Sequence, residues 1–222
     1  MQRYINPTPE QWKDLTQRGT ASYASLEPLA KEVFENVAQN GDQALLAYTA
    51  KFDKVKLEDF SVSTDEIESA KARIPRKLKL AIQKAKENID RFHRAQKTNE
   101  VKVEIQKGVN CWQRKIPIEK VGLYIPGGSA PLFSTILMLA IPAQVAGCSE
   151  VVMCSPPEFN GKLSDVILYT ANLCGVDTVF KVGGMQAIAG MTLGTETLPK
   201  VDKLFGPGNQ YVTVAKQLAT QY

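Results

Sequence analysis

The sequence is poor in the residues that build metal and disulfide sites. Its 222 residues include one histidine, His93, and four cysteines, at positions 111, 148, 154 and 174, with no Cys-x-x-Cys pair. A closed zinc site of the Cys/His type needs four ligands at close spacing, which these residues do not offer. A disulfide framework is typical of short secreted chains and is therefore not expected here.

Long apolar runs and a strong excess of one charge are also absent. The most apolar stretch, Ile136 to Ala143, is far shorter than the ~20 residues that cross a bilayer. The N-terminus, MQRYINPTPEQWKDL, lacks the apolar core of a signal peptide. The net charge is only +4, from 27 Lys+Arg against 23 Asp+Glu. We expect a cytoplasmic protein with no membrane and no nucleic-acid partner.

The first half of the sequence has the apolar spacing of helices. Between residues 25 and 40, apolar side chains recur at i, i+3, i+4 and i+7, and Gly41 could end that helix. Ser63 and Glu66 have the spacing of a capping box, which predicts a short helix from there to Ala72. The period of the pattern therefore predicts that this half is mainly helical.

A long helix and a hairpin follow. Residues Arg76 to Arg94 carry one apolar stripe, and we interpret His93, beside that stripe, as a surface or packing residue. Val101 to Ile105 then alternates with period two, as a half-buried strand does. Asn110 to Pro117 could pair with this strand as a hairpin.

From Lys120 onward the sequence repeats the order strand, loop, helix. The expected strands are VGLYI, EVVMCS, TVFKV and DKLF, each continuous in apolar residues, as in a buried parallel sheet. The fold class is therefore α/β: an incomplete Rossmann-like parallel sheet preceded by a largely helical segment. We divide the chain into an N-terminal arm (1–20), a mainly helical part of an incomplete α/β domain (21–119) and a Rossmann-like domain (120–222).

Three of the four strand-to-helix loops are rich in glycine: Pro126-Gly127-Gly128, Gly183-Gly184 and Gly206-Pro207-Gly208. In a parallel sheet these loops share one edge, where ligands bind. Each loop precedes a helix N-terminus, which favours an anion. No G-x-G-x-x-G or P-loop motif is present, so the loops predict a ligand with phosphates without naming it.

The polar residues at these loops are the candidates for ligand contact. Tyr124 precedes the first loop, Gln186 follows the second and Asn209 follows the third. Alternatively, Tyr124 packs under its loop with a satisfied hydroxyl, Asn209 caps the last helix, and Gln186 is an exposed first-turn residue. Cys154 ends a strand, but no base lies near it in sequence, so we interpret it as a buried apolar residue.

These segments resemble the first half of the histidinol dehydrogenase family. The resemblance lies in VGLYIPGGSAPLFSTILMLAIPAQVAGC, VVMCSPP, VGGMQAIAGMTLGTE and VDKLFGPGNQYVTVAK, and in NGDQALLAYTAKFDKV and RFHRAQK of the helical half. It covers essentially the whole chain. The resemblance implies NAD-dependent, zinc-assisted oxidation of L-histidinol to L-histidine through histidinaldehyde, in the last steps of histidine biosynthesis.

The family also implies which residues do what. Tyr124, Gln186 and Asn209 match its NAD-contacting positions, so the domain at 120–222 is expected to bind NAD. Its zinc ligands and its acid/base pair of glutamate and histidine lie in a C-terminal half that this chain does not contain. We therefore expect no catalytic residue and no metal ligand here, no activity of the chain alone, and a homodimer of the whole protein.

Two other functions stay open on the sequence. One is a binding module that holds NAD or another nucleotide without turnover. The other is a phosphosugar or nucleotide transferase, which would need a base or Mg²⁺-binding carboxylates near the loops. Asp165, Asp177 and Glu196 are the candidates, and they do not cluster in the sequence.

Overall fold

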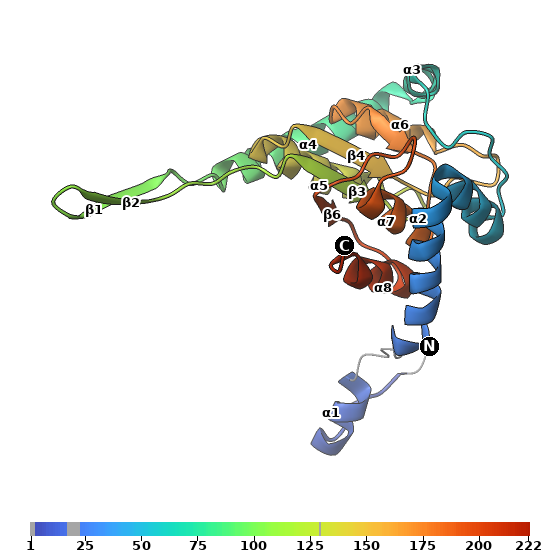
Figure 1. The fold of residues 1–222 in the computed structure, drawn as a ribbon, viewed down its shortest axis with the longest axis horizontal. Coiled ribbons are helices and arrows are strands. Elements are labelled where there is room, and N and C mark those ends of the chain that lie inside the picture. Colours follow the sequence, from blue (N-terminus) through green and yellow to red (C-terminus); the bar gives the residue numbers. More distant parts are fainter. Residues whose placement is uncertain (1–2, 17–22, 129) are drawn as a thin grey trace.

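A four-stranded parallel sheet forms the centre of the computed structural model, which describes residues 3–16, 23–128 and 130–222. Its strands are β3 (Lys120–Tyr124), β4 (Glu150–Cys154), β5 (Thr178–Phe180) and β6 (Lys203–Phe205), in the spatial order β5-β4-β3-β6. The predicted α/β class with a parallel sheet is confirmed (Figure 1). This order is that of a Rossmann half, and it reverses between β3 and β6.

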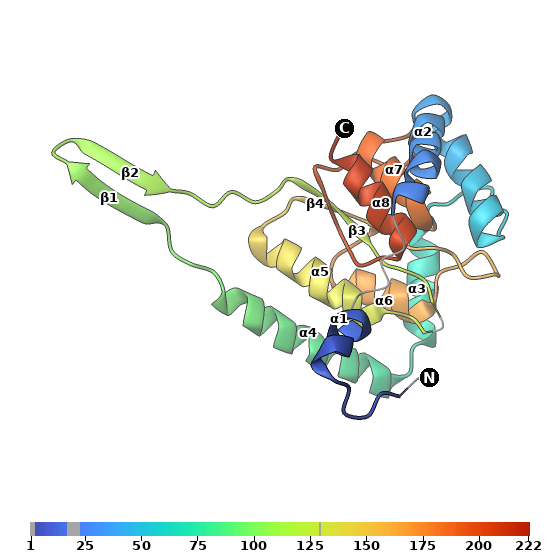
Figure 2. The same cartoon turned by 90° about the horizontal axis from the view of Figure 1, so that it is seen from below.

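Helices cover both faces of the sheet (Figures 1 and 2). Strand residues alternate between the faces, because successive side chains point to opposite sides. Leu123 and Met153 pack with α5 (Phe133–Ala146) and α6 (Asp165–Leu173). Tyr124 and Cys154 pack with α7 (Gly184–Leu193) and α8 (Gln210–Ala219) on the other face.

The helical segment before the sheet packs against the helices that cover the two faces of the sheet. Helix α2 (Glu27–Tyr48) breaks its regular geometry at Gly41, whose φ is 48°, and continues into the π-helix η2 (Thr49–Asp53). It shares a core with α7 and α8. Helices α3 (Thr64–Arg73) and α4 (Arg76–Ala95) share the other core with α5 and α6. The capping box of Ser63 and Glu66 is confirmed.

Among the described residues before α2 lie the helix α1 (Pro9–Thr16) and the 3₁₀ helix η1 (Tyr23–Ser25). None of the described helices combines the length and the apolar character that a membrane crossing needs.

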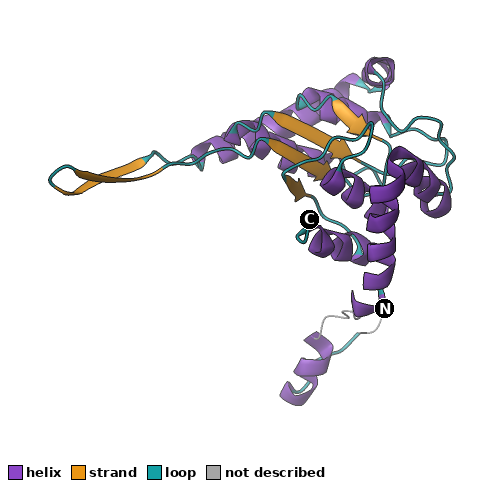
Figure 3. Ribbon diagram, in the orientation of Figure 1, coloured by secondary structure: helices purple, strands orange, loops and turns teal. Residues whose placement is uncertain are grey.

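The predicted hairpin is confirmed, but its predicted half-burial is wrong. Strands β1 (Val101–Gln106) and β2 (Val109–Gln113) pair antiparallel and extend away from the rest of the molecule (Figures 1 and 3). Every residue of both strands is exposed, including Val103 at 52% and Trp112 at 63%. The alternating pattern reports two faces of different polarity, and it does not report whether the apolar face is covered.

Candidate functional site

A cleft of about 1300 Å³ opens at the edge of the sheet where the strands end. The loops after β3 and β6 face each other there, so the cleft lies where the strand order reverses. Residues from all three glycine loops line it, including Gly127, Gly184 and Gly208. The sequence-based prediction that these loops meet at one edge is confirmed.

The groups in the cleft wall that attract an anion are backbone N–H groups rather than cationic side chains. Helix α7 begins at Gly184 and α8 follows Asn209, so both helix N-termini lie at the cleft. None of the described lining residues is Lys, Arg or His, and two of them, Asp53 and Glu158, are acidic. A phosphate bound here would therefore be held by N–H groups and helix dipoles.

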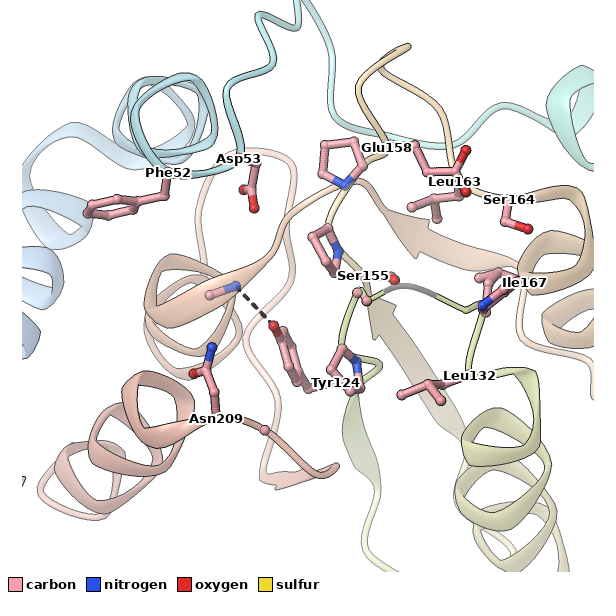
Figure 4. Close-up of a pocket in the computed structure, with 18 of the residues that line it drawn as sticks. Phe52, Asp53, Tyr124, Leu132, Ser155, Glu158, Leu163, Ser164, Ile167 and Asn209 are labelled. Carbon is pink, nitrogen blue, oxygen red and sulfur yellow. Dashed lines mark hydrogen bonds between the residues drawn. The ribbon is translucent and has the colours of Figure 1, made fainter. Parts of the chain in front are cut away.

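Tyr124 ends β3 with its ring buried, 4% exposed, and its hydroxyl directed to the start of α7 (Figure 4). The hydroxyl oxygen accepts the N–H of Gly184 at 3.1 Å. Burial raises the pKa of Tyr124 to about 12, while the Gly184 N–H opposes that rise. The phenol is therefore neutral at pH 7 and keeps its own proton to donate. In this structure Tyr124 therefore matches the alternative interpretation, a packed ring whose hydroxyl has a hydrogen-bond partner.

Asn209 caps α8, as the sequence allowed. Its Oδ1 accepts the N–H of Val212 at 3.1 Å, which uses the side-chain oxygen. The side chain is exposed and lies beside Tyr124 at the cleft (Figure 4). In the described part of the chain no group accepts a hydrogen bond from its Nδ2. Capping and ligand contact are therefore compatible, because they use opposite ends of one amide.

Gln186 lies in the first turn of α7, and its side chain is fully buried. The alternative of an exposed residue is therefore wrong. Its Nε2 donates to Oδ2 of Asp53 at 3.3 Å, and its Oε1 has no partner among the described residues. A ligand would reach Gln186 only if the neighbouring wall of the cleft moved, so its contact with a cofactor stays a prediction.

Asp53 is a cleft residue that the sequence did not reveal. It ends η2, far from the glycine loops in sequence, and its carboxylate faces the cleft (Figure 4). Burial raises its pKa to about 6. A lone aspartate in a helical segment gives no sequence signal of a site, and in the structure Asp53 lines the cleft and contacts Gln186.

The carboxylates proposed for a transferase do not form a site. Asp165 binds Arg73, with Nε to Oδ2 at 2.7 Å, and Asp177 accepts from Asn172 at 2.9 Å. Glu196 accepts the N–H of Asp42 at 2.8 Å. These three side chains have separate partners, and they are not among the residues that line the cleft. This arrangement counts against the transferase.

The cysteines should differ sharply in their reaction with thiol reagents. Cys154 is fully buried and burial strongly raises its pKa, whereas Cys111 is exposed on β2. Because the thiolate is the reactive form, we expect iodoacetamide to label Cys111 at least about 10-fold faster than Cys154. Peptide mass spectrometry of the native protein measures both rates, and labelling in urea is the control. Equal native rates would contradict the buried position of Cys154.

A family model and individual relatives match the sequence of this chain, and all carry the same description. A family model described as histidinol dehydrogenase matches residues 16–222. Histidinol dehydrogenase of Bacteroides thetaiotaomicron is 52% identical over 96% of this chain and 50% of its own length. The Escherichia coli enzyme is 52% identical over 96% of this chain and 49% of its own length.

A solved structure agrees with the sequence matches. The crystal structure of histidinol dehydrogenase from Elizabethkingia anophelis has a TM-score of 0.92 and 53% identity to this chain. The match covers 100% of this chain and 51% of that one. The chain therefore spans about half the length of these relatives. On these matches, the chain belongs to the histidinol dehydrogenase family.

Proposed function

We propose that this chain forms the NAD-binding part of a histidinol dehydrogenase, which oxidises L-histidinol to L-histidine through histidinaldehyde in histidine biosynthesis. The observation that supports this proposal is the cleft at the strand-order reversal, lined by three glycine loops and two helix N-termini. Such an edge is where Rossmann-like sheets bind dinucleotides. Membership of the family supports the reaction and the substrate.

The residues around the cleft fit a dinucleotide. Its phosphates would lie against the N–H groups at the starts of α7 and α8. The Tyr124 hydroxyl and the Asn209 Nδ2 would donate hydrogen bonds to it, since each has a donor that no described residue uses. When bound, NAD supplies the acceptor for the hydride that leaves the substrate carbon. The protein residues position that acceptor.

A zinc site does not fit the described residues of this chain. The described residues contain no group of three or more His, Cys, Asp or Glu side chains placed to hold a metal ion. We propose, from the family resemblance, that the zinc ligands and the acid/base residues belong to the rest of the protein, and that two complete subunits form a homodimer. The purified chain, given NAD and zinc, should then produce no NADH when histidinol is added.

Calorimetric titration of the chain with NAD tests the binding proposal. Measurable heat with one-to-one stoichiometry is the expected result, and no heat at millimolar NAD would contradict it. The alternative is a non-catalytic nucleotide-binding module, which the same cleft would serve. That alternative predicts equal binding of NAD and other adenine nucleotides, whereas a dehydrogenase should prefer NAD.

Asn209→Asp should weaken NAD binding about 10-fold without lowering stability. Aspartate caps a helix as well as asparagine does, so α8 keeps its cap. The substitution removes the Nδ2 donor and adds a negative charge beside the phosphates. Calorimetry and a thermal melt measure the two effects. The matched control is Asn160→Asp, which adds the same charge at another residue of the cleft wall. Equal affinities of wild type and Asn209→Asp would leave Asn209 as a helix cap only.

A further inference from the structure

Asp53 lies at the junction between the helical segment and the glycine turn before α7. Its Oδ2 accepts a hydrogen bond from Gln186, which lies 133 residues later in the sequence. Its Oδ1 lies beside Gly183, where a Cβ would be 3.2 Å from that oxygen. No described cation forms an ion pair with Asp53, and the nearby Lys54 donates its Nζ to the carbonyl of Lys51 at 2.8 Å. The Asp53 carboxylate therefore contacts the glycine turn before α7 and forms no salt bridge with a described residue.

A carboxylate at this position selects one orientation of the Gln186 amide. Ionised aspartate only accepts hydrogen bonds, so it favours the amide NH₂ and disfavours the amide oxygen. The pKa of Asp53, about 6, leaves the group ionised at pH 7.5. With Nε2 held by Asp53, Oε1 of Gln186 must point elsewhere. It lies beside Gly184, where a Cβ would be only 2.8 Å from it.

The same contacts continue to Tyr124. Gly184 carries the N–H that donates to the Tyr124 hydroxyl at 3.1 Å. Gly184 also has a positive φ of 60°, so its backbone adopts a conformation that few other residues accept. Hydrogen bonds therefore join Asp53 to Gln186 and Gly184 to Tyr124, and the amide oxygen of Gln186 lies close to Gly184 between the two pairs.

We propose that Asp53 is a positioning residue of the cofactor site: it fixes the Gln186 amide and, through it, the Gly184 turn that orients the Tyr124 hydroxyl. When the neighbouring wall of the cleft moves, the unpartnered Oε1 of Gln186, which is buried in this structure, is then presented as an acceptor for an N–H or O–H donor of the bound dinucleotide. The role of this acceptor rests on the proposed binding of NAD. The contact between Asp53 and Gln186 does not.

Two substitutions separate positioning from charge. Asp53→Ala removes the acceptor, and we expect NAD affinity to fall about 5- to 10-fold at pH 7.5. Asp53→Asn keeps an acceptor oxygen of the same shape, and its affinity should stay within about 2-fold of wild type. Glu58→Ala is the control, because Glu58 is an exposed carboxylate five residues along the same segment. Wild-type affinity of Asp53→Ala, or equal loss in Asp53→Asn, would overturn the proposal.

A second measurement decides the contact without NAD. In a ¹⁵N-labelled protein, the side-chain amide signals of Gln186 are assigned from their loss in Gln186→Glu. Asp53→Ala should move these signals, and Asp53→Asn should leave them much closer to the wild-type positions. Unchanged signals in Asp53→Ala would overturn the proposal even if NAD binds. If the signals move but wild type binds no NAD, the proposed function fails while the contact stands.

Discussion

Gly206→Ala is expected to destabilise the protein by about 3 kcal/mol or more. A Cβ on Gly206 would lie 2.1 Å from the carbonyl oxygen of Tyr124, which belongs to the backbone and cannot rotate away. The φ of Gly206 is 140°, a region that residues with a side chain rarely adopt. The alanine must therefore push β6 and β3 apart at the edge where the cleft opens.

Urea unfolding followed by circular dichroism measures this loss. Gly128→Ala is the matched control, because Gly128 lines the same cleft and a Cβ there would meet no atom within 4 Å. The control should lie within about 0.5 kcal/mol of wild type, as most unconstrained surface substitutions do. Similar stabilities of the two variants would mean that the loop after β6 does not approach Tyr124 as closely as described.

Phe34→Ala is expected to cost about 3–5 kcal/mol of unfolding free energy. The Phe34 side chain is fully buried in the core that α2 shares with α7 and α8, and its ring stacks on Tyr222 at 5.2 Å between centroids. Removing the ring deletes these contacts and leaves a cavity that the surrounding helices fill only partly. The expected loss is a large fraction of the stability of a typical domain.

The control for this substitution is Phe159→Ala. Phe159 is 92% exposed, so its truncation removes almost no buried area. Thermal and urea unfolding should separate the two variants clearly, with Phe159→Ala close to wild type. If Phe34→Ala unfolded like the control, α2 would not be packed on α7 and α8. The position of Asp53 beside Gln186 would then lose its support as well.

Local patterns predicted the elements, because each depends on residues close in sequence. The apolar strands and the capping box of Ser63 were predicted, and so was the meeting of the glycine loops, because parallel strands end at one edge. The order of the strands was not predicted, since apolar runs do not state which strand neighbours which. The division of the chain at residue 120 stays a prediction.

The candidate site was predicted in its polar loop residues and missed at Asp53. Tyr124 follows from its place at the end of a strand and Asn209 from its place after a glycine loop, and the sequence pattern marks both. Asp53 reaches the cleft through the break of α2 at Gly41, the π-helix that follows it and the packing of α2 on α7. These are long-range contacts, and a pattern of local spacing does not contain them. The exposure of the hairpin was missed for the same reason.

None of the described residues that line the cleft is a cation, and this has a consequence for how a ligand would be held there. Backbone N–H groups and helix ends attract an anion only at short range, whereas lysine and arginine side chains attract it from a distance. The carboxylates of Asp53 and Glu158 add a weak repulsion. A dinucleotide bound in this cleft would therefore be held by short-range contacts rather than by cationic side chains of the lining. The shape of the three glycine loops would then decide which ligand fits.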